Sequence, residues 1–205
     1  MTAPICIAIV VWLLAAHCGQ RALQWCLVFG AAMAVVIVSK LAFIGWGIGI
    51  RSLDFIGFSG HAARVGAIYP VAAYLLCREA RPPVRWAAVI GASLLALLVA
   101  VSRVKVLSHS PAEAAAGLAL GLAAAGAFIA LMRGTRRFTP NPWLVGITVL
   151  VLVLQTRVVR GDGRPFDSHV FLTGVALNLS GHDSPYVRWS WQRLPHPYTP
   201  PCPVE

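Results

Sequence analysis

The sequence predicts an all-α fold, a polytopic membrane helix bundle with about six transmembrane helices. Of its 205 residues, 58% are hydrophobic and only 12% are charged. Soluble domains have roughly a quarter charged residues and just under half apolar ones. The apolar residues here gather in long uncharged runs, which indicates that the bilayer is the solvent.

Six apolar runs supply these helices. A spanning helix needs about 20 apolar residues, with about 17 as the usual lower limit. The second and fifth runs meet that length, the third and fourth need only short flanks, and the first and last are short enough to be re-entrant. We expect the helices at about Pro4–Ala16, Ala22–Ile44, Ala62–Cys77, Trp86–Val101, Ala114–Met132 and Trp143–Gln155.

The chain is interpreted as a membrane-embedded domain, residues 1–156, followed by a polar tail rich in proline and tryptophan, residues 157–205. The tail is too hydrophilic to cross a membrane. Its side stays open, because six full crossings and its early arginines favour opposite faces. In the fifth run, Gly117, Gly121 and Gly126 form a small-residue surface of the kind that lets membrane helices approach closely.

The net charge of +10 comes mainly from arginines at the ends of apolar runs. This placement is typical of membrane topology and lipid headgroup contacts rather than nucleic-acid binding. Basic residues fall in three short connections between the apolar runs, which is typical of a cytoplasmic face. The two intervening loops, about Gly45–Gly60 and Ser102–Ala112, therefore share the opposite face. We expect it to be the extracytoplasmic face of an inner (plasma) membrane protein. The basic residues of the three short connections are Arg21, then Arg78, Arg81 and Arg85, then Arg133, Arg136 and Arg137.

These two loops contain an unusual concentration of polar side chains. The first is preceded by Lys40 and contains Arg51, Asp54 and the segment 58–61, Phe-Ser-Gly-His. The second contains the segment 102–113, Ser-Arg-Val-Lys-Val-Leu-Ser-His-Ser-Pro-Ala-Glu. Ionisable groups at membrane depth are costly and usually functional. Several cations and two histidines on one face predict an anion site, and a tetrahedral phosphate suits it.

Three short motifs in this region resemble the signatures of the type 2 phosphatidate phosphatase superfamily. Ser102-Arg103, five residues, His109, three residues and Glu113 resemble the third signature, which normally ends in aspartate. Ser59-Gly60-His61 resembles the second, which usually has proline where Phe58 stands. Lys40 with Arg51 resembles the first, although ten residues rather than six separate them and serine follows the arginine.

The resemblance implies hydrolysis of a phosphomonoester or pyrophosphate on a lipid through a phosphohistidine, without a metal or cofactor. His109 is then the nucleophile, Glu113 orients it, and His61 protonates the leaving oxygen. The implied phosphate contacts are Lys40, Arg103, Ser59, the Gly60 amide and Arg51. Two histidines suit this chemistry independently, because nucleophile and acid need separate protonation states.

Two other functions stay open at this point. One is a lipid phosphotransferase of the same fold, and the other is a non-enzymatic transporter or channel whose basic loops bind anionic lipid. The start of the fifth helix also has two possible registers. Either Ser110 is the N-cap and Glu113 is its capping-box partner, or Ser108 is the N-cap and His109 and Glu113 share a helical face. We favour the Ser108 register.

Overall fold

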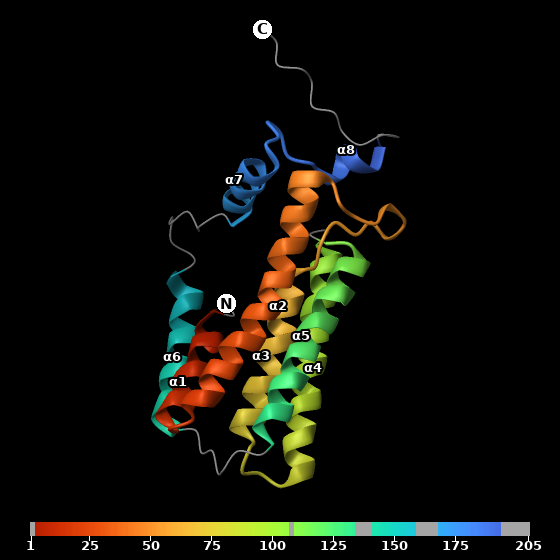
Figure 1. Ribbon diagram of the computed structural model, residues 1–205. Coiled ribbons are helices and arrows are strands. Elements are labelled where there is room, and N and C mark those ends of the chain that lie inside the picture. The colour runs from red at the N-terminus through yellow and green to blue at the C-terminus, as the bar shows by residue number, and fades with distance from the viewer. Residues whose placement is uncertain (1–2, 107–108, 134–140, 159–167, 194–205) are drawn as a thin grey trace.

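The computed structural model describes residues 3–106, 109–133, 141–158 and 168–193, and these residues are almost entirely helical (Figure 1). Each of the six apolar runs forms a helix, so the all-α prediction is confirmed, and no named strand occurs in the part described. The elements are α1 Ala3–Ala15, α2 Gly19–Trp46, the 3₁₀ helix η1 Arg51–Leu53, α3 Gly60–Leu76, α4 Pro82–Lys105, α5 Pro111–Met132, α6 Pro142–Val158, α7 Ser168–Ser180 and α8 Arg188–Arg193.

Three of these helices, α2, α4 and α5, are long and apolar enough to cross a membrane. Shorter apolar helices cover Pro4–Ala15, Pro142–Val151 and His169–Ser180. The 17-residue helix α3 packs mainly against α4 and α5, and most of its residues are buried. The chain is therefore a helical membrane protein with α3 inside the bundle.

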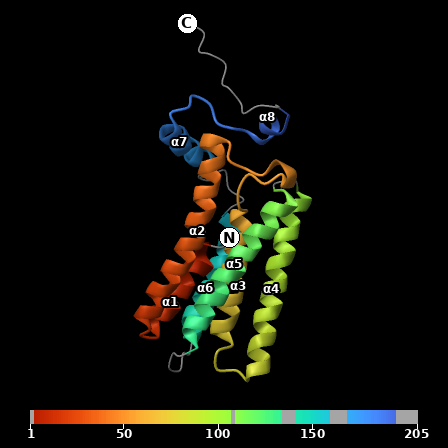
Figure 2. The ribbon, with the colours of Figure 1, turned by 45° about the vertical axis from the view of Figure 1, so that its right-hand side comes forward.

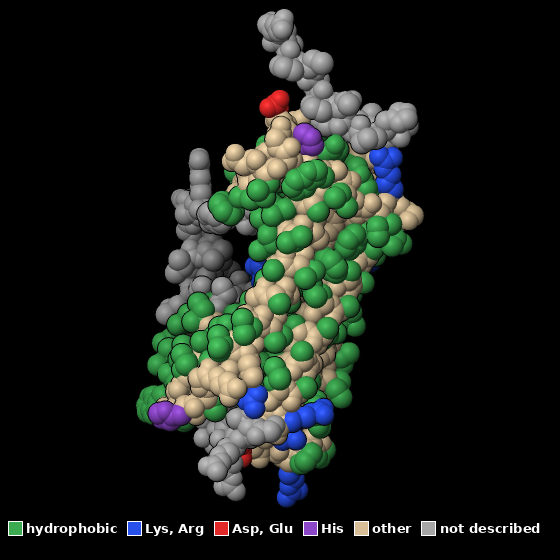
Figure 3. Space-filling view, in the orientation of Figure 1, with side chains coloured by type: hydrophobic (Ala, Val, Ile, Leu, Met, Phe, Trp, Pro, Cys, Tyr) green, Lys and Arg blue, Asp and Glu red, His purple; other side chains and the backbone are tan. Residues whose placement is uncertain are grey.

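The helices α2 to α5 run lengthwise, and α1 lies beside one half of α2 (Figures 1 and 2). The connections α2–α3 and α4–α5 lie at the same end of the bundle, as the sequence predicts (Figure 1). Lysine and arginine side chains gather at the other end (Figure 3). Of the basic residues predicted for that end, Arg136 and Arg137 lie outside the described residues.

Helices α3 and α5 approach each other at two glycines. A Cβ atom on Gly117 would lie 2.5 Å from the Ser59 carbonyl oxygen, and one on Gly121 would lie 2.2 Å from that of Ala63. Both distances are shorter than any stable contact, so only glycine permits this spacing. The third predicted small residue, Gly126, has no neighbour within 4 Å of its Cβ position and does not contribute.

Residues 168–193 fold back onto the end that carries the two polar connections (Figure 1). The backbone N–H of Tyr186 donates to the Ile44 carbonyl at 2.9 Å, and the Trp191 indole N–H donates to the Gly47 carbonyl at 2.9 Å. The His182 Nδ1 atom lies 2.8 Å from the Gly45 carbonyl oxygen, which gives the second Ser-Gly-His sequence, Ser180 to His182, a structural contact. Residues 168–193 of the tail thus lie at the polar end, a point that the sequence left open.

The glycine contact gives a stability prediction. Gly121→Ala should lower the free energy of unfolding by about 1–3 kcal/mol, the usual cost of overpacking, because the added methyl group collides with the α3 backbone. Gly126→Ala on the same helix is the matched control and should leave stability nearly unchanged. Thermal unfolding of both purified variants in detergent measures the difference. Equal stability of the two variants would contradict the packing described here.

Candidate active site

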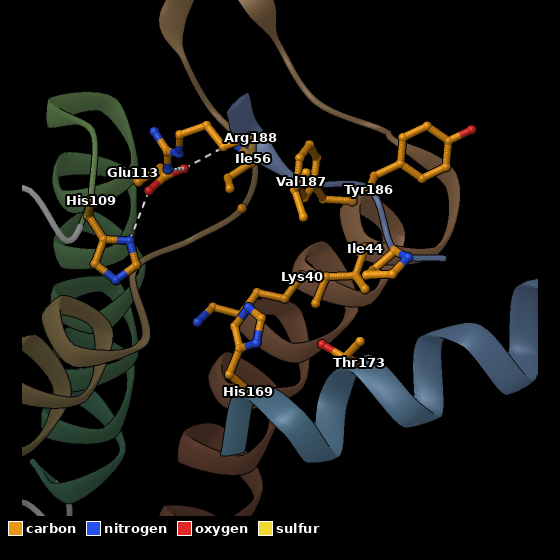
Figure 4. Close-up of a pocket in the computed structure, with 13 residues that line it drawn as sticks. Lys40, Ile44, Ile56, His109, Glu113, His169, Thr173, Tyr186, Val187 and Arg188 are labelled. Carbon is orange, nitrogen blue, oxygen red and sulfur yellow. Dashed lines mark hydrogen bonds and ion pairs between the residues drawn. The ribbon is translucent and has the colours of Figure 1, made fainter. Parts of the chain in front are cut away.

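The carboxylate of Glu113 lies at the centre of the polar end. Its Oε1 atom accepts from the Ile56 backbone N–H at 3.0 Å and from Arg188 Nη2 at 2.5 Å. Its Oε2 atom accepts from the Ser110 backbone N–H at 3.2 Å and pairs with His109 Nδ1 at 2.8 Å (Figure 4). The side chain is only 1% exposed. This buried carboxylate therefore has four donors for its four acceptor positions.

Helix α5 begins at Pro111 with Ser110 as its N-cap, so the favoured Ser108 register is wrong. The Ser110 hydroxyl accepts from the Glu113 N–H at 3.2 Å, and the Glu113 carboxylate accepts from the Ser110 N–H, which completes a capping box. Proline at the first helical position favours this register because its missing N–H needs no helical partner there. His109 precedes the helix, yet it reaches the same carboxylate. Glu113 therefore both caps the helix and contacts His109, whereas each of the two registers assigned it only one of these roles.

The contact with Glu113 determines which nitrogen of His109 is available. An ionised carboxylate only accepts hydrogen bonds, so the proton lies on Nδ1 and the lone pair lies on Nε2. The His109 side chain is 16% exposed and lines a cavity. The ring thus has a fixed orientation and one basic nitrogen left to meet a ligand.

Positive charge surrounds His61. Lys40 on α2 and Arg64 on α3 act electrostatically on one another and on His61, and Arg103 and His109 also act on His61. Arg103 lies in the last turn of α4 rather than in the predicted loop, because the helix continues to Lys105. Its Nε atom is buried and has no hydrogen-bond partner among the described residues. A buried donor without a partner costs about 1–3 kcal/mol, and an anion would satisfy it.

The other expected phosphate contacts occupy different places. Ser59 is fully buried, and its hydroxyl accepts from the Ala62 N–H at 3.5 Å as the N-cap of α3. Gly60 is the first residue of α3, beside the Arg64 guanidinium. Arg51 lies in η1 with its guanidinium 5.4 Å from the centre of the Trp191 ring. Of the predicted site residues, Lys40, His109 and Glu113 line the cavity described next, and Arg188 lies there as well. The predicted residues that do not line it are Arg51, His61, Ser59, Gly60 and Arg103.

A cavity of about 360 Å³ opens beside His109 and Glu113. Its walls come from the end of α2, the α2–α3 connection, the start of α7 and residues 185–188 (Figure 4). Sequence reasoning missed His169, Thr173 and Arg188 on this wall. For Arg188 the signal in the sequence was weak, since it is one arginine among aromatic residues in a polar tail. Within the described residues, no three histidine, cysteine or acidic side chains are grouped as metal ligands.

The fold and this site define a membrane-embedded helical protein whose histidines and cations share one end of the bundle. Residues 51–137 match the model of the PAP2 superfamily. The chain is also 39% identical over 168 residues to the Klebsiella pneumoniae "Uncharacterized 22.5 kDa protein in cps region", covering 80% of this chain and 78% of that protein. No solved structure gives a significant match. The chain belongs to the PAP2 superfamily, whose members are phosphatases that hydrolyse phosphoesters.

The shared role of Glu113 gives the second prediction. Glu113→Gln replaces one acceptor oxygen by an amide N–H₂ that faces two donors. We expect phosphatase turnover to fall at least about tenfold, the lower range for a lost catalytic contact. The unfolding free energy should fall by about 1–3 kcal/mol, since buried donors lose their partner.

Asn141→Ala is the matched control for a lost helix cap, because the Asn141 side chain accepts from the Trp143 N–H at 3.0 Å near the opposite end. It should lower stability by about 0.5–2 kcal/mol and leave turnover unchanged. Near-normal turnover in a folded Glu113→Gln variant would leave Glu113 with a capping role alone.

Proposed function

We propose that the protein hydrolyses a phosphomonoester or pyrophosphate on a membrane lipid, with His109 as the nucleophile. The observation that carries this proposal is the Glu113–His109 pair, 2.8 Å between Oε2 and Nδ1, on the wall of a cavity shared with Lys40. A buried acceptor that fixes one ring nitrogen leaves the other ready to attack, the arrangement expected for an activated nucleophile.

In the first step, Nε2 of His109 bonds to phosphorus while the bond from phosphorus to the leaving oxygen breaks. His61, which becomes charged once the substrate phosphate offsets the neighbouring cations, gives its proton to that oxygen. The resulting imidazolium charge on His109 is stabilised by the Glu113 carboxylate. In the second step, water loses a proton to His61 and attacks phosphorus, the P–N bond breaks, and inorganic phosphate leaves.

Fixed positive charge supports both transfers. Lys40, Arg103 and Arg64 lie close enough to His61 to act on it electrostatically. They are suited to stabilising the phosphoryl oxygens as charge develops in the transition state. The Gly60 amide at the start of α3 adds a donor of the kind that binds phosphate at helix N-termini. We therefore propose a reaction that does not depend on a metal ion.

The surroundings of the site support a lipid substrate. Three helices can span a membrane, and the cavity wall includes Phe43, Ile44 and Ile56 beside the cationic groups. Such a wall suits a phosphate carried on an apolar chain. Because the arginine-rich end is expected to face the cytoplasm, we propose that the site faces the extracytoplasmic side of the plasma membrane.

The experiment that tests this function uses purified protein in detergent with lipid monophosphates and a lipid pyrophosphate. Release of inorganic phosphate should persist in excess chelator, because side chains supply the positive charge. Vanadate, which adopts the geometry of pentacoordinate phosphorus, should inhibit. Complete loss of activity on chelation that magnesium restores would refute the metal-independent mechanism. Transfer of phosphate to a second lipid without release would indicate a phosphotransferase.

A further inference from the structure

Arg188, the first residue of α8, connects two acidic side chains that are far away in sequence. Its Nη2 atom donates to Glu113 Oε1 at 2.5 Å, and its Nη1 atom donates to Asp54 Oδ2 at 2.5 Å. The Arg188 side chain is 30% exposed, whereas Glu113 is 1% exposed. The guanidinium therefore reaches from the edge of the cavity to the buried carboxylate that orients His109.

The other three contacts of Glu113 do not replace this charge. Two are backbone N–H groups, from Ile56 and Ser110, and the third is the ring of His109. Among the described residues, Arg188 is the permanently charged group that hydrogen-bonds Glu113. A buried carboxylate that loses its cation is destabilised as an anion. It then becomes a poorer acceptor for the Nδ1–H of His109, and the ring loses its fixed tautomer.

We propose that Arg188 is a positioning residue of the active site, which acts through Glu113 to present Nε2 of His109. This proposal rests on the proposed function for the identity of the reaction. It makes the docked segment 168–193 part of the catalytic unit, held by the contacts of Tyr186 and Trp191 with the end of α2.

The kinetic test compares Arg188→Ala and Arg188→Lys with Lys105→Gln, which removes an exposed positive charge at the same end. We expect Arg188→Ala to lower kcat at least about tenfold and to change KM less than about threefold, because the lost contact orients the nucleophile and does not bind substrate. Added guanidinium ion should restore part of kcat, and Arg188→Lys should retain part of it. Lys105→Gln should behave as the wild type. A change confined to KM would overturn the proposal.

A second readout does not need catalysis. ¹⁵N NMR of imidazole-labelled protein should show His109 as the Nδ1–H tautomer in the wild type and as a mixture in Arg188→Ala, with His109→Gln assigning the signal. An unchanged His109 signal in Arg188→Ala would overturn the positioning role. Absence of phosphate release by the wild type would instead refute the proposed function, so the two failures are distinct.

A separate observation concerns the hydroxyl of Thr173 on α7. Its Oγ1 atom is buried and has no hydrogen-bond partner within the described part of the chain. A threonine in a helix commonly bonds a carbonyl one turn earlier, as Thr148 does with Leu144 at 2.8 Å. Thr173 lines the cavity and its oxygen points toward Lys40 and His169 (Figure 4). A hydroxyl in this state favours a ligand oxygen.

We further infer that Thr173 binds a second oxygen of the leaving group, close to the bond that breaks but not part of it, in the cavity that Lys40 also lines. The substrate class is then a lipid phosphate with an oxygen acceptor close to the reacting phosphorus. A second phosphate and a glycerol ester oxygen both provide this chemistry. The apolar wall at Phe43 and Val187 would contact the adjoining chain. This inference also rests on the proposed function.

The test measures KM for a lipid pyrophosphate, a glycerolipid phosphate and p-nitrophenyl phosphate, which has no such acceptor. Thr173→Val keeps the side-chain shape without the hydroxyl. It should raise KM about 3–10-fold for a lipid substrate, the effect of one hydrogen bond, and leave the p-nitrophenyl phosphate value unchanged. Thr173→Ser keeps the hydroxyl and should keep the wild-type KM.

An increase for the pyrophosphate alone identifies the second phosphate as the acceptor, and an increase for both lipids identifies the ester oxygen or its equivalent. Equal changes for all three substrates, or no change for any, would overturn the role of Thr173. The wild-type rates on the same panel report separately on the proposed function.

Discussion

The arrangement of the polar end depends on one buried carboxylate. Glu113 joins three other parts of the chain: residues 109–110 just before α5, the α2–α3 connection at Ile56, and α8 at Arg188. A buried anion is stable only when its acceptor positions are filled and its charge is compensated. The position of each of these segments therefore depends on the others, because all of them contact the same carboxylate. The geometry of the candidate site is a consequence of satisfying this group.

The bundle brings these segments together through close backbone packing. Gly117 and Gly121 let α5 lie directly against the start of α3, and the Ser59 N–H donates to the Glu113 carbonyl at 3.1 Å. Helix starts that bear His61 and Glu113 are thereby held side by side. The small residues of a membrane helix thus contribute to the site as well as to the stability of the bundle, because they determine how closely two helix N-termini approach.

The sequence predicts the helices and the shared polar end well, because apolar run length and arginine placement follow directly from the bilayer. It also predicts the contact between His109 and Glu113, though from the wrong helix register. The register error arises because a capping carboxylate can reach past the cap to a residue outside the helix. Arg188 and Thr173 could not be predicted, since their positions depend on how residues 168–193 fold back, and no spacing rule encodes that contact.

The departure of this chain from the first family signature has a structural counterpart. Ten residues rather than six separate Lys40 from Arg51. Arg51 lies in η1 and stacks on Trp191, a residue of the docked segment. The same segment supplies Arg188 to Glu113 and to Asp54. A buried carboxylate needs a compensating cation, and here a segment outside the three motifs delivers it. Motif spacing therefore describes one way of building such a site, whereas the charge balance around Glu113 describes the constraint itself.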